Sequence, residues 1–249
     1  MTSAVLVLED GTVFKGKAFG KSGTTTGEIV FATGMTGYQE TLTDPSYAGQ
    51  IVVQTAPHIG NTGVNSRDEE SGKIWVDGYV VRDVSRVVSN FRAEDSLGNE
   101  LIKYEVVGIS NIDTRALTRH LRSVGVMRAG IFSGTDSERP VEELVKVVSS
   151  TDQMAGRNLS NTVSTSKIVE YPATGKRIGS VAILDLGCKS STIENMTDRG
   201  LDVTLYPATA TANDLLSNSP DAVFYSNGPG DPSTAAGQVE ALQQILKSG

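Results

Sequence analysis

Apolar positions in the first 150 residues occur mainly as short runs, a pattern that predicts β-strands. The chain opens with an apolar run at 4–8, then Asp10-Gly11, then a β-rich run at 13–19. Asp-Gly between two such runs is typical of a hairpin, so we expect an antiparallel start. Further strands are expected in apolar segments bounded by Gly, Asp or Ser, at 28–33, 50–55, 74–82, 106–109 and 127–132.

Helical spacing is clearest over residues 114–124. Asp113 is placed to cap the free amides of the first turn. Leu117, Leu121 and Val124 recur at helical spacing, so they fall on one face of the predicted helix. A helix is therefore predicted directly after the strand at 106–109.

A second helix and a change of pattern set the expected domain limits. Proline at the first turn and apolar residues at helical spacing predict a helix over 140–148. Strands with few, segregated helices indicate a mixed α+β domain over 1–150. Residues 151–176 are rich in Ser, Thr, Asn and Gly, which predicts a linker or loop-rich crossover. We expect a separate domain over 177–249.

Residues 177–249 alternate strand and helix, which predicts a parallel sheet wrapped by helices. The expected strands are 180–186, 201–206 and 222–225, and the expected helices are 190–199, 212–218 and 234–247. A doubly wound sheet normally holds five or more strands. The prediction is therefore an incomplete doubly wound parallel α/β domain, with exposed apolar residues on its last helix.

Composition narrows the class of protein. The 249 residues, 38% of them hydrophobic and 20% charged, suit one large or two ordinary globular domains. A net charge of −7 and the lack of basic runs argue against a nucleic-acid partner. No apolar run approaches the roughly 20 residues of a membrane helix, and the start lacks signal-peptide features. We expect a cytoplasmic protein without membrane contact.

The strongest candidate for chemistry is the run Ser226-Asn227-Gly228-Pro229-Gly230-Asp231-Pro232, which follows the strand at 222–225. In open α/β sheets, ligands bind beyond the carboxyl ends of the strands. The glycines allow backbone amides to approach a ligand, the prolines stiffen the turn, and amides held in this way stabilise an oxyanion. Every residue in the run is also a turn former, so a strand-to-helix turn without a ligand is the alternative.

This run resembles the glycine-rich oxyanion loop of triad-type, or class I, glutamine amidotransferases. Residues 181–189 are similar to the first strand of that domain in the small subunit of carbamoyl-phosphate synthetase. Five further blocks resemble the same subunit in order: Leu8-Glu9-Asp10-Gly11, Met35-Thr36-Gly37-Tyr38-Gln39-Glu40, Leu42-Thr43-Asp44-Pro45-Ser46-Tyr47, Pro57-His58-Ile59-Gly60-Asn61 and Ile112-Asp113-Thr114-Arg115. The resemblance spans nearly the whole chain.

The resemblance implies a function as well as a fold. In that family the small subunit hydrolyses glutamine, and a large subunit uses the ammonia with ATP, Mg and bicarbonate to make carbamoyl phosphate for arginine and pyrimidine biosynthesis. It implies that Ser46, Gly228 and Gly230 contact the bound glutamine, with the Gly228 amide as oxyanion donor. From the residues alone, the favoured interpretation of Ser46 is a hydroxyl that caps the turn after Pro45. No cofactor is expected in this chain, and the expected partners are the large subunit and L-glutamine.

The resemblance matches none of the family's catalytic groups to a residue of this sequence. Hydrolysis needs a thiolate, a histidine base and a carboxylate. The family's nucleophile follows the next strand, with its His and Glu further on, so we expect the chain alone to be inactive. Cys188 is flanked two positions away by Leu186 and Ser190, which suit a nucleophile elbow poorly. We expect Cys188 to pack beneath the glycine loop.

The remaining polar candidates have simpler interpretations. One cysteine and two distant histidines cannot form a Cys/His metal site, and no metal is expected. His120 is expected to be half-buried and hydrogen-bonded, and His58 to have a structural or interface role. The acidic run 68–70 is expected to be a solvated patch. The alternative to an enzyme component is a non-catalytic docking or regulatory module that binds a large synthetase subunit, which would not need Gly228 and Gly230.

Overall fold

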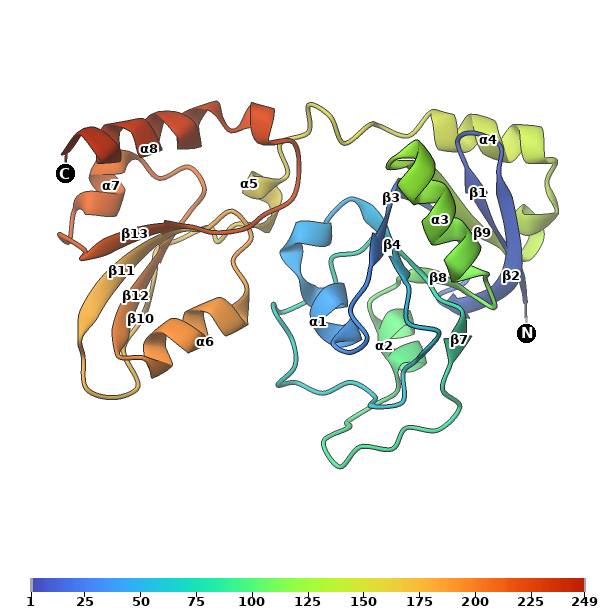
Figure 1. The fold of residues 1–249 in the computed structure, drawn as a ribbon, viewed down its shortest axis with the longest axis horizontal. Coiled ribbons are helices and arrows are strands. Elements are labelled where there is room, and N and C mark those ends of the chain that lie inside the picture. Colours follow the sequence, from blue (N-terminus) through green and yellow to red (C-terminus); the bar gives the residue numbers. More distant parts are fainter. Residues whose placement is uncertain (1, 249) are drawn as a thin grey trace. The chain divides into compact units, whose positions relative to one another are not determined.

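The computed structural model describes residues 2–248, which form two compact units (Figure 1). The first unit holds the residues up to Thr43 together with Gly49–Gln153, and the second holds Asp44–Ala48 together with the residues from Met154 onward. Residues 44–48 thus cluster with the second unit, although they lie inside the range predicted for the first domain. None of the helices formed by residues 2–248 has the length and apolar character needed to cross a membrane.

The first unit is built on a closed barrel with the strand order β1-β2-β8-β6-β4-β3-β9. The strands are β1 (Ser3–Leu8), β2 (Val13–Gly20), β3 (Thr24–Ala32), β4 (Gln50–Gln54), β6 (Gly78–Val80), β8 (Val107–Ser110) and β9 (Met127–Ser133). The predicted hairpin is confirmed, because β1 and β2 pair antiparallel and Leu8 N donates to Thr12 O across the turn. Neighbours β3, β4, β6 and β8 pair in parallel, so the barrel is mixed.

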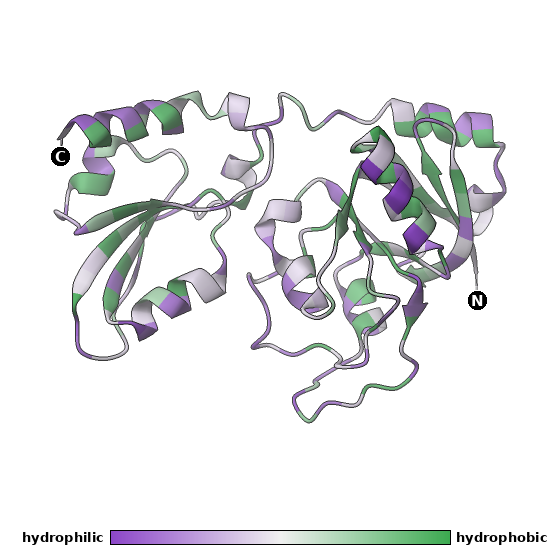
Figure 2. Ribbon diagram, in the orientation of Figure 1, coloured by the Kyte–Doolittle hydropathy of each residue, from purple (hydrophilic) through white to green (hydrophobic). Residues whose placement is uncertain are grey.

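The barrel interior is an apolar core formed by buried residues of its strands. Figure 2 shows that hydrophobic residues are frequent along these strands. Helix α3 (Thr114–Val124) packs on this core through Leu117 and Leu121, and Asp113 caps it by accepting from Ala116 N at 3.0 Å. Val124, on the same predicted face, does not share this burial. Val124 is the last helical residue and is 60% exposed, so core contact ends one turn before the helix does.

Helix α4 (Val141–Ser149) packs on the other side of β1 and β9 through Leu144 and Val148. Pro140 is its cap rather than its first helical residue. The unit also contains elements that the sequence pattern did not predict. These are α1 (Tyr38–Thr43), α2 (Leu97–Lys103), the 3₁₀ helix η2 (Gly134–Glu138) and a parallel pair of short strands, β5 (His58–Ile59) and β7 (Asp83–Val84).

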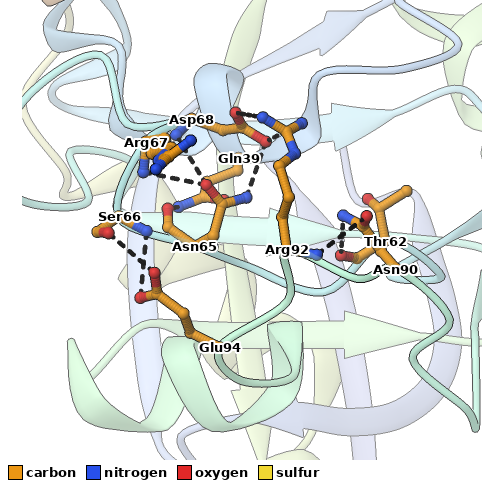
Figure 3. A network of polar contacts seen from close by, with 9 residues as sticks. All are labelled: Gln39, Thr62, Asn65, Ser66, Arg67, Asp68, Asn90, Arg92 and Glu94. Carbon is orange, nitrogen blue, oxygen red and sulfur yellow. Dashed lines mark hydrogen bonds and ion pairs between the residues drawn. The ribbon is translucent and has the colours of Figure 1, made fainter.

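A polar network orders the long segment between β5 and α2 (Figure 3). The Gln39 side chain accepts from Asn65 N at 3.0 Å and donates to Asn65 O at 2.7 Å. Arg92 donates to both carboxylate oxygens of Asp68, each at 3.1 Å. The acidic run 68–70 is therefore not the solvated patch that we expected, since Asp68 is ion-paired and Glu70 is buried.

The second unit contains a four-stranded sheet in the order β10-β12-β11-β13. The predicted parallel strands are β11 (Gly179–Leu184), β12 (Leu201–Tyr206) and β13 (Ala222–Tyr225), with β11 in the middle. The expectation of only three strands is wrong. Strand β10 (Val169–Tyr171) pairs antiparallel with β12 and lies in the range expected to be a linker. Its three residues are too short a run for the alternation pattern to mark.

Helices cover both faces of this sheet, as Figure 1 shows. Helix α6 (Ser190–Asp198) packs Ile193 against one face, and α7 (Ala212–Leu216) packs Leu215 against the other. Helix α8 (Ala236–Ser248) joins the α7 side through Ile245. The remaining short elements are η1 (Pro45–Tyr47), α5 (Ser160–Val163) and η3 (Pro232–Thr234). The doubly wound arrangement is confirmed, and the apolar residues Val239 and Leu246 of α8 are exposed as expected.

Candidate functional site

The glycine-rich run begins where β13 ends, beside the end of β11. Leu184 and Tyr225 are register partners at the ends of these two parallel strands. Ser226 N donates to Leu184 O at 3.1 Å, and the Ser226 hydroxyl accepts from Leu186 N at 2.8 Å. The loops that follow the two strands are therefore joined at the carboxyl edge of the sheet, where ligands bind in this class of fold.

Gly228 lies in close contact with the chain that leaves β11. A Cβ atom added there would stand 1.9 Å from Leu186 O, so a side chain does not fit without moving backbone. The residue is nevertheless exposed on its open side. Its amide donates to no backbone acceptor within the part of the chain that the structure describes. An exposed, unsatisfied N–H on a constrained loop is the kind of donor that stabilises an oxyanion.

Gly230 is constrained by its backbone angle and by the segment 156–159. Its φ is +94°, and an added Cβ would lie 2.7 Å from Arg157 O. The adjacent Asp231 carboxylate accepts from Gly156 N at 2.8 Å, and hydrogen bonds from the amides of Gly156 and Ser233 hold the pKa of Asp231 below its usual value. Segment 156–159 thus anchors the far end of the glycine loop.

Ser46 lies on the 3₁₀ turn η1, and its hydroxyl reaches the glycine loop. The Ser46 Oγ accepts from Asn227 Nδ2 at 2.7 Å, and Asn227 Nδ2 also donates to Gly187 O at 3.0 Å. The turn is capped by Asp44, whose carboxylate accepts from Ser46 N at 2.9 Å. The alternative in which Ser46 caps the turn is therefore wrong, because Asp44 has that role.

Two residues that sequence reasoning did not assign hold this arrangement together. Asn227 bridges Ser46 to the loop after β11, and Lys189 Nζ pairs with the buried Asp44 carboxylate at 2.7 Å. Asn227 was already part of the recognised run, but nothing in the sequence indicated what its side chain contacts. Lys189 is the N-cap residue of α6, at the end of the loop that follows β11, and loops at the carboxyl ends of parallel strands often provide residues of a binding site.

The geometry brings Ser46 and Gly228 to one place and sets Gly230 at the anchored end of the same loop. A hydroxyl and an unsatisfied amide there offer hydrogen-bond donors to a carbonyl or carboxylate oxygen. Because Asn227 donates to Ser46 Oγ, the Ser46 proton is free to be donated elsewhere. The arrangement is suited to holding a polar ligand beside an oxyanion donor.

The other candidates lie apart from this chemistry. Cys188 is partly buried against the apolar cluster of β11, β12 and α6. His120 Nε2 lies 2.7 Å from Asp10 Oδ2 and its side chain is 29% exposed, which confirms a half-buried, hydrogen-bonded imidazole. His58 Nδ1 lies 3.1 Å from Asp83 Oδ2. Within residues 2–248, no group of three or more His, Cys, Asp or Glu side chains is placed to hold a metal ion.

Comparison with known families agrees with this geometry. Residues 182–249, which include the glycine loop, match the model "Glutamine amidotransferase class-I". Residues 6–131 match the model "Carbamoyl-phosphate synthase small chain, CPSase domain". The chain belongs to the carbamoyl-phosphate synthase small chain family.

Curated relatives carry the same description. A "Carbamoyl phosphate synthase small chain" from Streptomyces coelicolor is 55% identical over 100% of this chain and 65% of its own length. Those from Streptomyces avermitilis and Bifidobacterium longum are 57% and 55% identical, over 64% and 63% of their lengths. The chain thus spans just under two thirds of the relatives that it matches. Among solved structures, an aminopeptidase from Aneurinibacillus sp. strain AM-1 aligns with a TM-score of 0.31 at 12% identity, over 87% of this chain and 50% of that one.

Proposed function

We propose that this chain forms the glutamine-binding side of the glutaminase site of carbamoyl-phosphate synthase. In this proposal, Ser46, Gly228 and Gly230 contact L-glutamine, and the Gly228 amide donates to the oxyanion that forms when the amide carbon is attacked. The Asn227 side chain carries the proposal, because it ties the glycine loop to the Ser46 hydroxyl at 2.7 Å and to Gly187 O, in the loop after β11, at 3.0 Å. A simple strand-to-helix turn would not require this link to Ser46.

The wider role follows from the family as a proposal. The released ammonia passes to a large chain in the cytoplasm, which binds ATP, Mg and bicarbonate and makes carbamoyl phosphate for arginine and pyrimidine biosynthesis. We further propose that residues 1–249 bind glutamine without hydrolysing it. The reason is that the family's nucleophile, histidine and glutamate match no position among these residues, and hydrolysis needs all three.

The test is titration of the ¹⁵N-labelled chain with L-glutamine, with D-glutamine as the stereochemical control. Saturable shifts of the Gly228 and Gly230 amide signals and of the Asn227 side-chain amide are expected with the L isomer only. Ser46→Ala should weaken binding about two- to tenfold, the value of one hydrogen bond. Ser217→Ala removes an exposed hydroxyl of the same unit and should leave affinity unchanged.

Variants of Asn227 test the residue that positions Ser46 and the glycine loop, whereas Ser46→Ala removes a proposed direct contact with glutamine. Asn227→Ala and Asn227→Asp both lose the donor to Gly187 O, and the aspartate also places a second charge near Asp44, 3.5 Å from Asn227 Nδ2. Both are expected to weaken binding more than Ser46→Ala does. Shifts that are equal for the two glutamine isomers would refute the site. Ammonia release by the chain alone would refute only the proposed inactivity.

The glutamine titration, combined with a pull-down of the large chain, distinguishes a glutaminase component from a pure docking module. A module that only docks on the large chain has no reason to bind glutamine, so a chain that pulls down the large chain yet shows no glutamine shifts would favour the docking module. We favour the glutaminase component because the Gly228 amide is exposed and without a backbone acceptor.

A further inference from the structure

Three arginines on α3 form a cationic surface in the first unit. Arg115, Arg119 and Arg122 are spaced four and three residues apart, which places them along one face of the helix. All three are exposed, and Figure 2 shows strongly hydrophilic positions along α3. Within residues 2–248 their guanidinium groups form no ion pair, whereas the nearby Arg128 and His120 are paired with Glu9 and Asp10.

The arginines line a hollow of about 360 Å³ together with three threonines. Thr33 and Thr55 follow the ends of β3 and β4, which are parallel neighbours, and Thr55 N donates to Ala32 O at 3.1 Å. Thr118 stands on α3 itself. The lining residues are therefore three arginines and three threonines, with no carboxylate among them, and their aliphatic and methyl groups form most of the exposed lining.

The scaffold beneath the hollow is rigid. Leu117 and Leu121 are fully or almost fully buried in the barrel core, so the orientation of α3 against the strands is fixed by packing. The arginine face is held in place by the opposite, apolar face of the same helix. Donors that are positioned in advance lose less entropy when they bind a ligand.

The arrangement is electrostatically unfavourable by itself. Like charges at helical spacing repel one another and weakly destabilise a helix. No carboxylate among residues 2–248 forms an ion pair with them, although the whole protein carries a net charge of −7. An external anion would relieve the repulsion, and guanidinium groups bind phosphate oxygens with two parallel hydrogen bonds.

We propose that this hollow is a binding site for a small phosphate-bearing anion. Its volume lies within the range of small-ligand pockets. The three arginines provide charge and paired donors, and the threonine hydroxyls provide additional donors at the strand ends. The site lies wholly in the first unit and does not depend on the proposed glutamine site, so the two proposals can fail separately.

The test is titration of the ¹⁵N-labelled 249-residue chain with inorganic pyrophosphate, observed at the arginine Nε–Hε groups and at the amides of Thr33 and Thr55. Sodium chloride at matched ionic strength, about 0.15 M, controls for general screening. Saturable shifts confined to the hollow are expected. Arg119→Gln should weaken binding at least tenfold. Arg119→Lys keeps the positive charge but loses the paired donors of the guanidinium group, so it should weaken binding less.

The matched control is Arg86→Gln, which removes an exposed arginine of the same unit outside the hollow and should change affinity less than twofold. Circular dichroism confirms that each variant is folded. Equal losses for Arg86→Gln and Arg119→Gln would overturn the proposal, because binding would then follow net charge. Binding of a hexaglutamate peptide at this face without binding of pyrophosphate would also overturn it, in favour of an acidic protein segment.

Discussion

The two site glycines are required for different reasons. Gly228 has no room for a Cβ atom, because Leu186 O would be 1.9 Å away. Gly230 needs a positive φ of 94° and a close approach to Arg157 O. A sequence motif marks both positions in the same way, as turn-forming residues, and only the structure separates steric exclusion from backbone conformation.

Alanine substitution tests the steric requirement at Gly228. Gly228→Ala should lower the free energy of unfolding by about 1–3 kcal/mol, the usual cost of overpacking, and should weaken glutamine binding. Gly237→Ala in α8 is the matched control, because an added Cβ there meets nothing within 4 Å. Helix propensity predicts that the control gains up to about 1 kcal/mol. Urea denaturation measures both, and a Gly228→Ala protein as stable as wild type would contradict the close approach.

At the residue scale, the sequence led to candidate site residues but not to the contacts that their side chains make. Ser46 and the glycine run were found through resemblance to a family. The hydrogen bond between Ser46 and Asn227 joins residues 181 positions apart, and no local pattern encodes such a contact. Lys189 was missed for the same reason, since its partner Asp44 is far away in the sequence.

At the element scale, prediction succeeded where periodicity is strong and local. Helices α3 and α6 and the three parallel strands of the second unit were found with small errors at their ends. Short elements such as α1 and the antiparallel β10 were not predicted, because a run of three to six residues is too short to show periodicity. Closure of the barrel could not be predicted either. It depends on pairings such as β2 with β8, which lie far apart in the sequence.

The loop after β13 provides a pH-dependent test at this scale. Hydrogen bonds from the amides of Gly156 and Ser233 hold the pKa of Asp231 below its ordinary value of 3.8. A carboxylate whose pKa is lower when folded stabilises the fold above the unfolded pKa. That contribution is lost as pH falls through the folded pKa. The anchoring of the loop on segment 156–159 should therefore persist at pH 4 to 5 and weaken only below about 3.8.

The measurement is an NMR pH titration of the Gly156 and Ser233 amide signals. Both are expected to move together with a midpoint below 3.8. Asp231→Asn keeps the side-chain shape without a titrating group, so the shared transition should vanish in that variant. A midpoint at or above the ordinary aspartate value would show that the carboxylate does not accept these hydrogen bonds in solution.

At the scale of the whole molecule, the order of residues in the sequence differs from their grouping in space. Residues 44–48 cluster with the second unit, while the residues on both sides of them belong to the first. The chain therefore passes between the units at 43/44, 48/49 and 153/154. Composition and periodicity predicted only the last of these crossings, because a five-residue excursion changes neither.

This grouping predicts where the effect of a substitution at Asp44 will appear. The buried Asp44 carboxylate pairs with Lys189 at 2.7 Å and accepts from Ser46 N. Asp44→Asn keeps the side-chain volume but removes the charge that pairs with Lys189. Hydrogen bonds to charged groups contribute about 1.5–3 kcal/mol, so local opening free energies at Ser46 and at 185–189 should fall by about 1–3 kcal/mol.

Hydrogen exchange followed by mass spectrometry or NMR measures these opening energies unit by unit. Protection in β1 and β9 should not change in Asp44→Asn, although these strands and Asp44 all lie within the first 150 residues of the sequence. Glu9→Gln provides the reverse control. It breaks the Glu9–Arg128 ion pair of 2.6 Å inside the first unit, so it should loosen β1 and β9 and leave 185–189 protected. If Asp44→Asn loosened β1 and β9 as much as 185–189, residues 44–48 would belong energetically to the barrel. The Ser46 side of the proposed glutamine site would then depend on the first unit for its position.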